Sequence, residues 1–376
     1  MISCTTNAMR VLIIPDKFKG TLTAAQAAEA ITRGWREARP EDTLELLPMS
    51  DGGDGFGPVM SDLLDAKPQR VSTVDAAGES RSAAWWFQEE TRTAVIETVQ
   101  AIGLALLPPG KFHPFELDTF GLGPLFRAAA EAGSTTCYAG IGGSATNDGG
   151  FGMARSLGWR FLDQTSTEIL RWIDLIRLDS VVSPKTKRFD ELIIAVDVQN
   201  PLLGPQGASR IYGPQKGLRT QDMDSAEAAL GCLAEVMHRQ FGVNYAEEPG
   251  AGAAGGLGFG LRAFLGGRFE SGFDLFARLS GLEKRLERVD LVITGEGAID
   301  SSTLMGKGVG EIARRCAERK IKCIGLAGNL TIAPESADSP FTQVFGIHPN
   351  LTTIEQAKAD PKFWLTKLAK EAAGAE

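Results

Sequence analysis

Glycine, hydroxyl and acidic residues are concentrated in residues 140–150, whose sequence is GIGGSATNDGG. An apolar strand is predicted directly before them, over 135–139. Glycine lets backbone N–H groups turn outward and approach a ligand closely. Several such groups form a cradle for an anion, which is strengthened where a helix begins just after it. The segment therefore predicts a phosphate-binding loop, and a plain glycine-rich turn is the alternative.

A second segment, DVQNPLLGP at 197–205, follows a strand predicted over 192–196. It places the carboxyl group of Asp197 at the end of that strand, which is the usual position of an active-site acid in an α/β sheet. We therefore expect Asp197 to act as a base or to lie close to a metal ion. A glycine-rich turn is again the alternative.

Three clusters of charged residues and glycine also follow predicted strands. They are DKFKG at 16–20, DGGDG at 51–55 and GEGAID at 295–300, after strands predicted over 10–14, 43–47 and 289–294. Ligands of open α/β sheets bind outside the carboxyl ends of the strands, so we expect the three clusters to face one crevice. Any one of them alone would be interpreted as a solvated acidic turn. Their occurrence at equivalent strand ends favours a site.

Two more segments carry glycine beside polar residues, GPQKG at 213–217 and PGAGAAGGLGFG at 249–260. Gly250, Gly252 and Gly255 give the second segment the spacing Gly-x-Gly-x-x-Gly. A dinucleotide-binding fingerprint needs a strand directly before it, and the residues Glu-Glu-Pro at 247–249 are unfavourable for a strand. We therefore predict a phosphate loop or a helix-packing loop here, not an NAD site.

The composition limits the class of protein. The chain has 376 residues, 43% of them hydrophobic, and a formal net charge of -8, which makes nucleic acid an unfavourable partner. Five scattered cysteines, without a Cys-x-x-Cys, favour a reducing compartment over a disulfide framework or a zinc site. The three histidines are far apart, and we assign no histidine site. The sequence has no apolar run long enough to span a membrane and no signal-peptide pattern at its start, so a cytoplasmic protein is expected.

The pattern of elements predicts an α/β protein. Residues 10–47 are predicted as β-α-β, with Thr23 and Gln26 forming a capping box at the start of the helix. Three strands over 71–75, 81–87 and 93–99 predict an antiparallel meander. Helices are expected over 122–132, 152–158 and 223–241. A β-α rhythm returns near the C-terminus, with strands over 289–294, 322–327 and 343–347 and a helix over 308–319. We expect a discontinuous first domain, residues 1–72 and 288–376, and an inserted second domain, residues 73–287.

These carboxylates, lysines and anion cradles are the groups that phosphoryl transfer needs, whereas hydride transfer would need a cofactor site that the sequence does not provide. The chain resembles the signature segments of the bacterial type I glycerate kinases, in order, at residues 16–20 with Leu22, 50–55, 142–150, 197–204, 213–217, 249–260, and 294–300 with Gly306 and Lys307. The resemblance implies ATP-dependent phosphorylation of D-glycerate, usually at the 2-hydroxyl, giving 2-phospho-D-glycerate. It also implies a fold that joins a Rossmann-like or flavodoxin-like domain to a mixed α/β domain, with the active site in the cleft between them.

Within this hypothesis each candidate residue has an expected role. Asp197 is expected to be the base, and Lys19 and Lys216 to neutralise phosphate or carboxylate charge. The expected ATP contacts are Gly142, Gly143, Ser144, Asn147, Gly252 and Gly255. The expected substrate contacts are Asp16, Asp51, Gly52, Asp54, Glu296 and Asp300. Asp197 and Glu296 are the candidates for Mg²⁺.

Three alternatives stay open. Lys17, Ala298 and Met305 stand where the family commonly has serine or a similar small residue, arginine and histidine. If they reshape the pocket, a kinase of another small hydroxy acid or sugar acid is favoured. A nicotinamide-dependent oxidoreductase would use residues 250–255. A non-catalytic sensor of hydroxy acids would bind without turnover. A homodimer is also left open.

Overall fold

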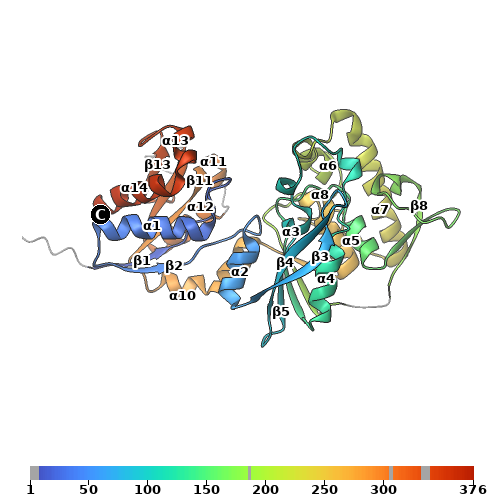
Figure 1. The fold of residues 1–376 in the computed structure, drawn as a ribbon, viewed down its shortest axis with the longest axis horizontal. Coiled ribbons are helices and arrows are strands. Elements are labelled where there is room, and N and C mark those ends of the chain that lie inside the picture. The colour runs from blue at the N-terminus through green and yellow to red at the C-terminus, as the bar shows by residue number, and fades with distance from the viewer. Residues whose placement is uncertain (1–7, 185–187, 305–307, 332–338) are drawn as a thin grey trace, which may run out of the picture. The chain divides into compact units, whose positions relative to one another are not determined.

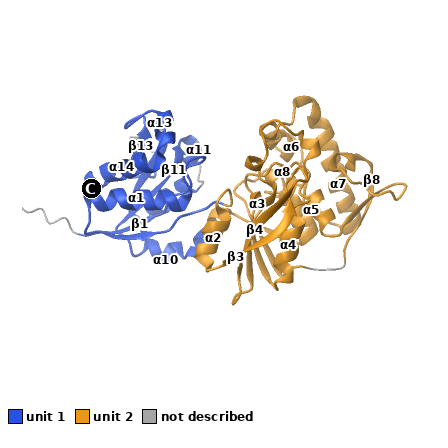
Figure 2. Ribbon diagram, viewed as in Figure 1, with its two compact units in different colours: residues 1–51, 276–376 blue, residues 52–275 orange. Residues whose placement is uncertain are grey.

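The computed structural model describes residues 8–184, 188–304, 308–331 and 339–376 of the chain (Figure 1). The chain forms two compact units (Figure 2). Unit 1 comprises residues 1–51 and 276–376, and unit 2 comprises residues 52–275. The boundaries between the units therefore lie at 51/52 and 275/276. The sequence analysis expected them at 72/73 and 287/288. The chain passes into unit 2 and back once, so unit 1 is built from the two ends of the sequence.

Unit 1 contains, within the described residues, a five-stranded parallel sheet of order β13-β12-β11-β1-β2. The strands are β1 (Arg10–Ile13), β2 (Thr43–Leu46), β11 (Leu291–Ile299), β12 (Lys322–Leu330) and β13 (Gln343–His348). Segments from both ends of the chain thus pair in one sheet, because β1 lies between β2 and β11. The parallel β-α-β organisation expected from the sequence is confirmed.

Helix α1 (Ala24–Ala38) begins at the predicted capping box, in which Thr23 Oγ1 accepts a hydrogen bond from Gln26 N and the Gln26 side chain accepts one from Thr23 N. Its apolar face buries Ile31 and Trp35 completely. Burial of such side chains contributes roughly 1.5–3 kcal/mol each, so this face determines how the helix packs. The other helices of unit 1 are α10 (Leu282–Leu286), α11 (Ser301–Leu304), α12 (Val309–Arg319), α13 (Ile354–Ala359) and α14 (Pro361–Gly374).

Strand β11 is longer than the sequence indicated. Residues 295–300 were expected to follow the strand, but β11 continues to Ile299 because β12 pairs with it as far as Leu330. Glu296 therefore lies inside the strand, in register with Ala327. Gly295, Gly297 and the acidic side chain of Glu296 obscured this continuation in the sequence.

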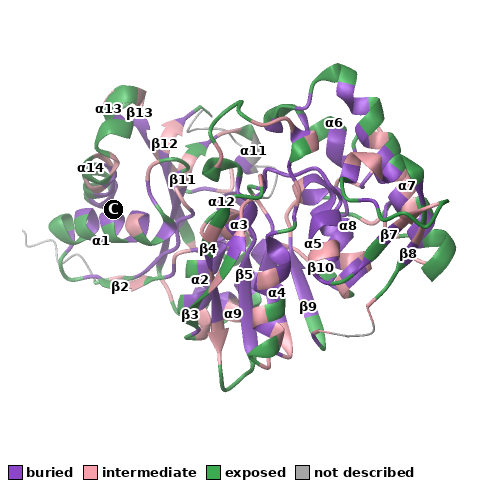
Figure 3. Ribbon diagram, turned by 45° about the vertical axis from the view of Figure 1, so that its right-hand side comes forward, coloured by how far each residue is buried: buried purple, intermediate pink, exposed green. Residues whose placement is uncertain are grey.

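Unit 2 contains a six-stranded mixed sheet among the described residues, of order β10-β9-β6-β5-β4-β3. The strands are β3 (Lys67–Val74), β4 (Ser80–Gln88), β5 (Thr93–Glu97), β6 (Thr136–Gly140), β9 (Glu191–Ala195) and β10 (Arg268–Glu270). The predicted antiparallel meander is confirmed for β3, β4 and β5, and the remaining pairs are parallel. Figure 3 shows the middle of this sheet as buried. A separate hairpin, β7 (Arg160–Asp163) and β8 (Leu178–Val182), was not predicted.

Helices surround this sheet in unit 2. They are α2 (Phe56–Leu64), α3 (Val99–Ile102), α4 (Leu122–Glu131), α5 (Phe151–Ser156), α6 (Ala208–Tyr212), α7 (Met223–Phe241) and α8 (Ala253–Leu265), with short 3₁₀ turns at Leu104–Leu106, Pro114–Glu116, Trp172–Arg177, Pro214–Lys216 and Thr220–Asp222. Helix α9 (Gly272–Ser280) contains the second boundary between the units. Helix α2 lies against β4 and β5, and a Cβ on Gly57 would come within 2.1 Å of the Trp86 ring. This packing explains why residues 52–72 belong to unit 2.

Among the residues that the structure describes, no helix has the length and apolar character needed to cross a lipid bilayer.

Gly34 allows α1 to pack closely on α14, because a Cβ at this position would lie 2.0 Å from the carbonyl oxygen of Thr366. Gly34→Ala should therefore destabilise unit 1 by about 1–3 kcal/mol, since a backbone atom must move. Gly231→Ala in α7 is the matched control, because its Cβ would approach only Leu203, at 3.9 Å. That variant should be neutral or more stable by up to about 1 kcal/mol. Thermal unfolding of both variants decides; equal effects would contradict this account.

Candidate active site

The loop at residues 141–150, which we call the glycine loop, connects β6 to α5 in unit 2. Gly143, Gly149 and Gly150 have φ of 80°, 63° and 78°, a region that favours glycine. Gly142 and Gly143 are only partly covered, whereas Ser144 and the residues after it are buried. The accessible part of the loop is therefore its beginning.

The beginning of the glycine loop lies beside the DGGDG segment. Gly142 N donates a hydrogen bond of 3.3 Å to Gly52 O, and a Cβ on Gly142 would lie 2.7 Å from Gly53 Cα. A Cβ on Gly143 would lie 2.4 Å from Asp54 Oδ1. The structure thus brings together two segments that the sequence analysis singled out separately. Asp51 belongs to unit 1 and Gly52 and Asp54 belong to unit 2, so the DGGDG segment is divided between the units.

Asp148 holds the buried end of the glycine loop, and sequence analysis assigned it no role. Its Oδ2 accepts hydrogen bonds from Thr119 N at 2.9 Å, Thr119 Oγ1 at 2.7 Å and Gly152 N at 2.9 Å, and its Oδ1 accepts one from Gly150 N at 3.2 Å. Burial raises the pKa of Asp148, and the hydrogen bonds from Gly152 and Thr119 act in the opposite direction. The sequence signal that could have identified Asp148 is an acidic residue inside a glycine-rich loop directly before a helix.

Lys216 lies beneath the same loop, on the 3₁₀ turn Pro214–Lys216. Its Nζ donates to Thr146 O at 2.6 Å and to Ser144 Oγ at 3.2 Å. Desolvation lowers the pKa of Lys216 to about 7, and the negative charge of Asp148 acts against this shift. The side chain of Asn147 is also buried, and its Nδ2 donates to Ser209 Oγ at 2.9 Å. Three of the predicted ligands thus fix the loop to its surroundings.

Gly252 and Gly255 are packing positions at the start of α8. A Cβ on Gly252 would lie 2.1 Å from Pro201 O, and one on Gly255 would lie 2.0 Å from Thr146 O. Ala254, Gly255 and Gly256 all have left-handed backbone angles. Residues 242–252, all of them described, contain no strand, so the Gly-x-Gly-x-x-Gly spacing lacks the strand that a dinucleotide fingerprint requires.

Asp197 follows β9, as predicted, and is half-buried. Its Oδ1 accepts hydrogen bonds from Ser271 Oγ at 3.0 Å, Gly272 N at 3.0 Å and Phe273 N at 3.5 Å. The last two donors belong to the first turn of α9, whose unpaired N–H groups favour a negative charge. Asp197 therefore caps a helix as well as standing at a strand end.

Unit 1 contributes a separate cluster of charged groups. Lys17 Nζ lies 3.6 Å from Asp16 Oδ1 and 3.5 Å from Asp51 Oδ1. Burial raises the pKa of Asp16 to about 6, since the opposing charge of Lys17 offsets only part of the desolvation. Lys19 is exposed, and its backbone N would lie 3.1 Å from a Cβ on Gly297 of β11.

Glu296 belongs to this unit 1 cluster. Thr303 Oγ1 donates to Glu296 Oε1 at 2.8 Å, and Thr303 N donates to Asp300 Oδ1 at 3.4 Å. Burial raises the pKa of Glu296 to about 7; the hydrogen bond from Thr303 opposes this, and the carboxylates of Asp16, Asp300 and Asp51 add to it. A carboxyl group with such a pKa is suited to proton transfer near neutral pH.

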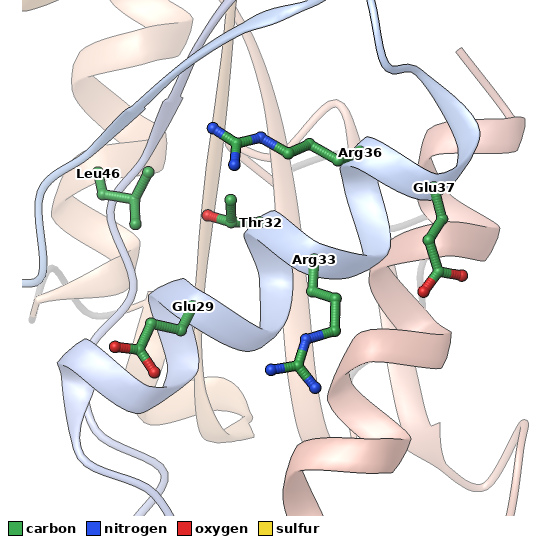
Figure 4. Close-up of a pocket in the computed structure, with 6 residues that line it drawn as sticks. All are labelled: Glu29, Thr32, Arg33, Arg36, Glu37 and Leu46. Atoms are coloured by element: carbon green, nitrogen blue, oxygen red, sulfur yellow. The ribbon is translucent and has the colours of Figure 1, made fainter.

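The candidates do not all assemble in one unit. Asp197 lies in unit 2 and Glu296 in unit 1, and within the described residues no three His, Cys, Asp or Glu side chains are arranged to hold a metal ion. Met305 and Lys307 lie outside the described residues. A pocket of about 600 Å³ on α1 and β2 contains none of the candidates (Figure 4). It is lined by Glu29, Thr32, Arg33, Arg36, Glu37 and Leu46.

Both units are α/β structures in which acidic residues follow parallel strands. Unit 2 adds a glycine loop held by the buried residues Asp148 and Lys216. These features are typical of enzymes that transfer phosphoryl groups. The family model described as "Glycerate kinase family" matches residues 11–375. The chain belongs to the glycerate kinase family and is an enzyme of the kinase class, which confirms the resemblance noted in the sequence.

Individual relatives agree with this assignment. The chain is 36% identical over 378 residues to a glycerate kinase of Bacillus subtilis (strain 168), with 97% of each chain covered. It is 39% identical over 367 residues to the glycerate 2-kinase of Escherichia coli (strain K12), with 93% of each covered. A crystal structure assigned to glycerate kinase 2 from Salmonella typhimurium LT2 matches with a TM-score of 0.83 and 34% identity, covering 98% of both chains. The α/β fold class is thereby confirmed.

Raising the pH should destabilise unit 1 between about 4.5 and 7. The folded protein keeps Glu296 protonated in this range because its pKa rises from 4.5 to about 7, while the unfolded chain releases the proton. Asp16, raised from 3.8 to about 6, adds to the same trend. Glu296→Gln should flatten the pH dependence of the unfolding temperature, and Glu29→Gln, at an exposed position, should not. A wild-type stability that rises steadily from pH 4.5 to 7 would contradict the proposed burial.

Proposed function

We propose that this enzyme transfers the γ-phosphoryl group of ATP to a hydroxyl group of D-glycerate, giving 2-phospho-D-glycerate and ADP. The observation that carries the proposal is the glycine loop, because its accessible residues Gly142 and Gly143 are held by buried anchors on one side and by Gly52 and Gly53 on the other. Backbone N–H groups of a preformed glycine loop are suited to polyphosphate, although Gly142 N itself already donates to Gly52 O. The names of the relatives support glycerate as the acceptor.

In this proposal the hydroxyl oxygen of glycerate forms a bond to the γ-phosphorus while the bond to the ADP oxygen breaks, and the hydroxyl proton passes to a carboxylate. Asp197 is our candidate for that carboxylate. Exposed Lys19 would neutralise phosphate or carboxylate charge. Asp16, Asp51, Asp54 and Asp300 are further candidates for contacts to substrate hydroxyl groups.

Mg²⁺ would shield the charge of the polyphosphate, as in other phosphoryl transfers. It takes oxygen ligands and is usually held by one or two carboxylates together with phosphate oxygens. Asp197 and Glu296 provide carboxylate oxygens of this kind, Glu296 when it is ionised. We also propose a cytoplasmic location, on the cysteine pattern of the sequence.

One observation favours a second candidate, a kinase of another small hydroxy acid. The resemblance noted in the sequence leads us to expect serine or a similar small residue at Lys17. Its ammonium group lies within 3.6 Å of both Asp16 and Asp51. An added cation among candidate substrate contacts would favour an acceptor with more negative charge or a longer chain than glycerate.

Purified protein should consume ATP in the presence of Mg²⁺ and D-glycerate, and ³¹P NMR should identify 2-phosphoglycerate as the product. A panel of other hydroxy acids in the same assay tests the second candidate. Formation of 3-phosphoglycerate would overturn the position of transfer only. Absence of a phosphorylated product from every acid would overturn the proposed function.

Asp197→Asn should lower kcat by roughly 10²–10⁴-fold, because a neutral amide can neither accept the proton nor hold a metal ion. The amide oxygen can still accept the hydrogen bonds from Gly272 and Phe273, so the unfolding temperature should change little. Asp197→Ala removes the carboxylate and the hydrogen bonds to α9. It should therefore also lower the free energy of unfolding, by about 1 kcal/mol, as expected for a lost helix cap. A nearly unchanged kcat in the Asn variant would refute the role of the carboxylate.

A further inference from the structure

Lys216 is a buried cation of unit 2, and the sequence analysis expected it to neutralise phosphate or carboxylate charge. Its residue is 7% exposed, and Nζ is enclosed by Ser144, Thr146 and Gly255. A Cβ on Gly255 would lie only 2.8 Å from Nζ, so Gly255 lies close beside the ammonium group. A lysine buried to this degree offers little access to a phosphate oxygen.

The hydrogen bonds of Lys216 form a chain that joins three segments. Lys216 Nζ donates to Ser144 Oγ at 3.2 Å, and Ser144 Oγ donates in turn to Ala254 O at 2.9 Å. Ala254 has a φ of 56°, which is unfavourable for a residue with a Cβ. Gly149 N adds a bond of 3.1 Å to Gly255 O. The chain therefore holds both the glycine loop and a strained turn of α8.

Burying the ammonium group of Lys216 is costly, so the hydrogen bonds that it makes must offset this cost. An unpaired buried charge is strongly unfavourable. The charge of Asp148 on the same loop favours the protonated lysine, although desolvation still lowers the pKa of Lys216 to about 7. A methionine of similar length would avoid the desolvation cost but would provide none of the hydrogen bonds.

We propose that Lys216 is a positioning residue that fixes the glycine loop through Ser144 and the carbonyl of Thr146, and that it does not contact the phosphate groups itself. This inference rests on the proposed function and differs from the expectation that Lys216 neutralises phosphate charge directly. A preformed loop with an accessible Gly143 would bind polyphosphate without the entropy cost of ordering the loop first. Loss of the lysine would therefore weaken binding and catalysis through a displaced loop.

The test uses the full-length protein and the variants Lys216→Met, Ser144→Ala and the double variant. Each is assayed for binding of a non-hydrolysable ATP analogue and for steady-state kinetics with ATP and glycerate. Lys216→Met should lower kcat/KM for ATP by roughly 10–100-fold, the range expected when a loop shifts by about 1 Å. The double variant should be no worse than Lys216→Met within about 3-fold, because both residues act through one chain. Ser144→Ala alone tests the same chain if the Met variant fails to fold.

Two controls separate positioning from the alternatives. Val236→Ala removes buried volume from α7 at a residue that has no part in the hydrogen-bond chain of Lys216. It should lower the unfolding temperature while leaving the kinetics below that temperature unchanged. Lys19→Met removes an exposed cation and should weaken the salt dependence of analogue binding, whereas Lys216→Met should leave that dependence as in the wild type. Additive effects of the two single variants, together with a weakened salt dependence in Lys216→Met, would overturn the proposal.

The outcomes also distinguish this inference from the proposed function. A wild-type protein that binds the analogue but phosphorylates no glycerate would refute the proposed function alone, and the binding data would still decide the role of Lys216. A wild-type protein that binds no nucleotide would overturn both.

Discussion

The close approach of the glycine loop to α8 is the constraint on which the candidate site of unit 2 depends. A Cβ on Gly260 would lie 2.7 Å from Gly150 Cα, and one on Gly256 would lie 2.9 Å from Gly149 Cα. Backbone meets backbone at these positions, so a side chain would require the loop to move. Glycine is required here because it lacks a Cβ. The accessible residues Gly142 and Gly143 precede this tightly packed part of the same loop directly.

Burial of polar groups beneath the loop follows from this contact. Asp148 and Lys216 are both removed from water, and each is surrounded by hydrogen-bond partners from the loop or its neighbours. Such groups are costly unless they are satisfied, and once satisfied they favour a single arrangement over many. Unit 1 uses burial in another way, because it raises the pKa values of Asp16 and Glu296 toward neutrality. Burial thus fixes the glycine loop in unit 2, whereas in unit 1 it raises the pKa values of two carboxyl groups.

Much of the fold could be predicted from local signals. The capping box at Thr23 and the apolar periodicity of α7 are properties of short segments, and α7 has the predicted bounds. The end of β11 could not be predicted, because its continuation to Ile299 depends on pairing with a strand about thirty residues later in the chain. The same reason applies to the boundary at 51/52, which the packing of α2 on β4 and β5 determines.

The candidate site shows where such prediction ends. Residue types and spacing identified the loop at 140–150 and the turn that carries Lys216, but they gave both segments the same task, which was contact with phosphate. The structure separates them by depth, since Gly143 is exposed and Lys216 is buried. Depth is a tertiary property. At Lys216 it depends on Gly255, which the sequence analysis placed in a segment that could be either a phosphate loop or a helix-packing loop. Whether Lys216 or Gly143 can contact a ligand therefore depends on which backbone segments cover it. The spacing of residues along the sequence does not contain that information.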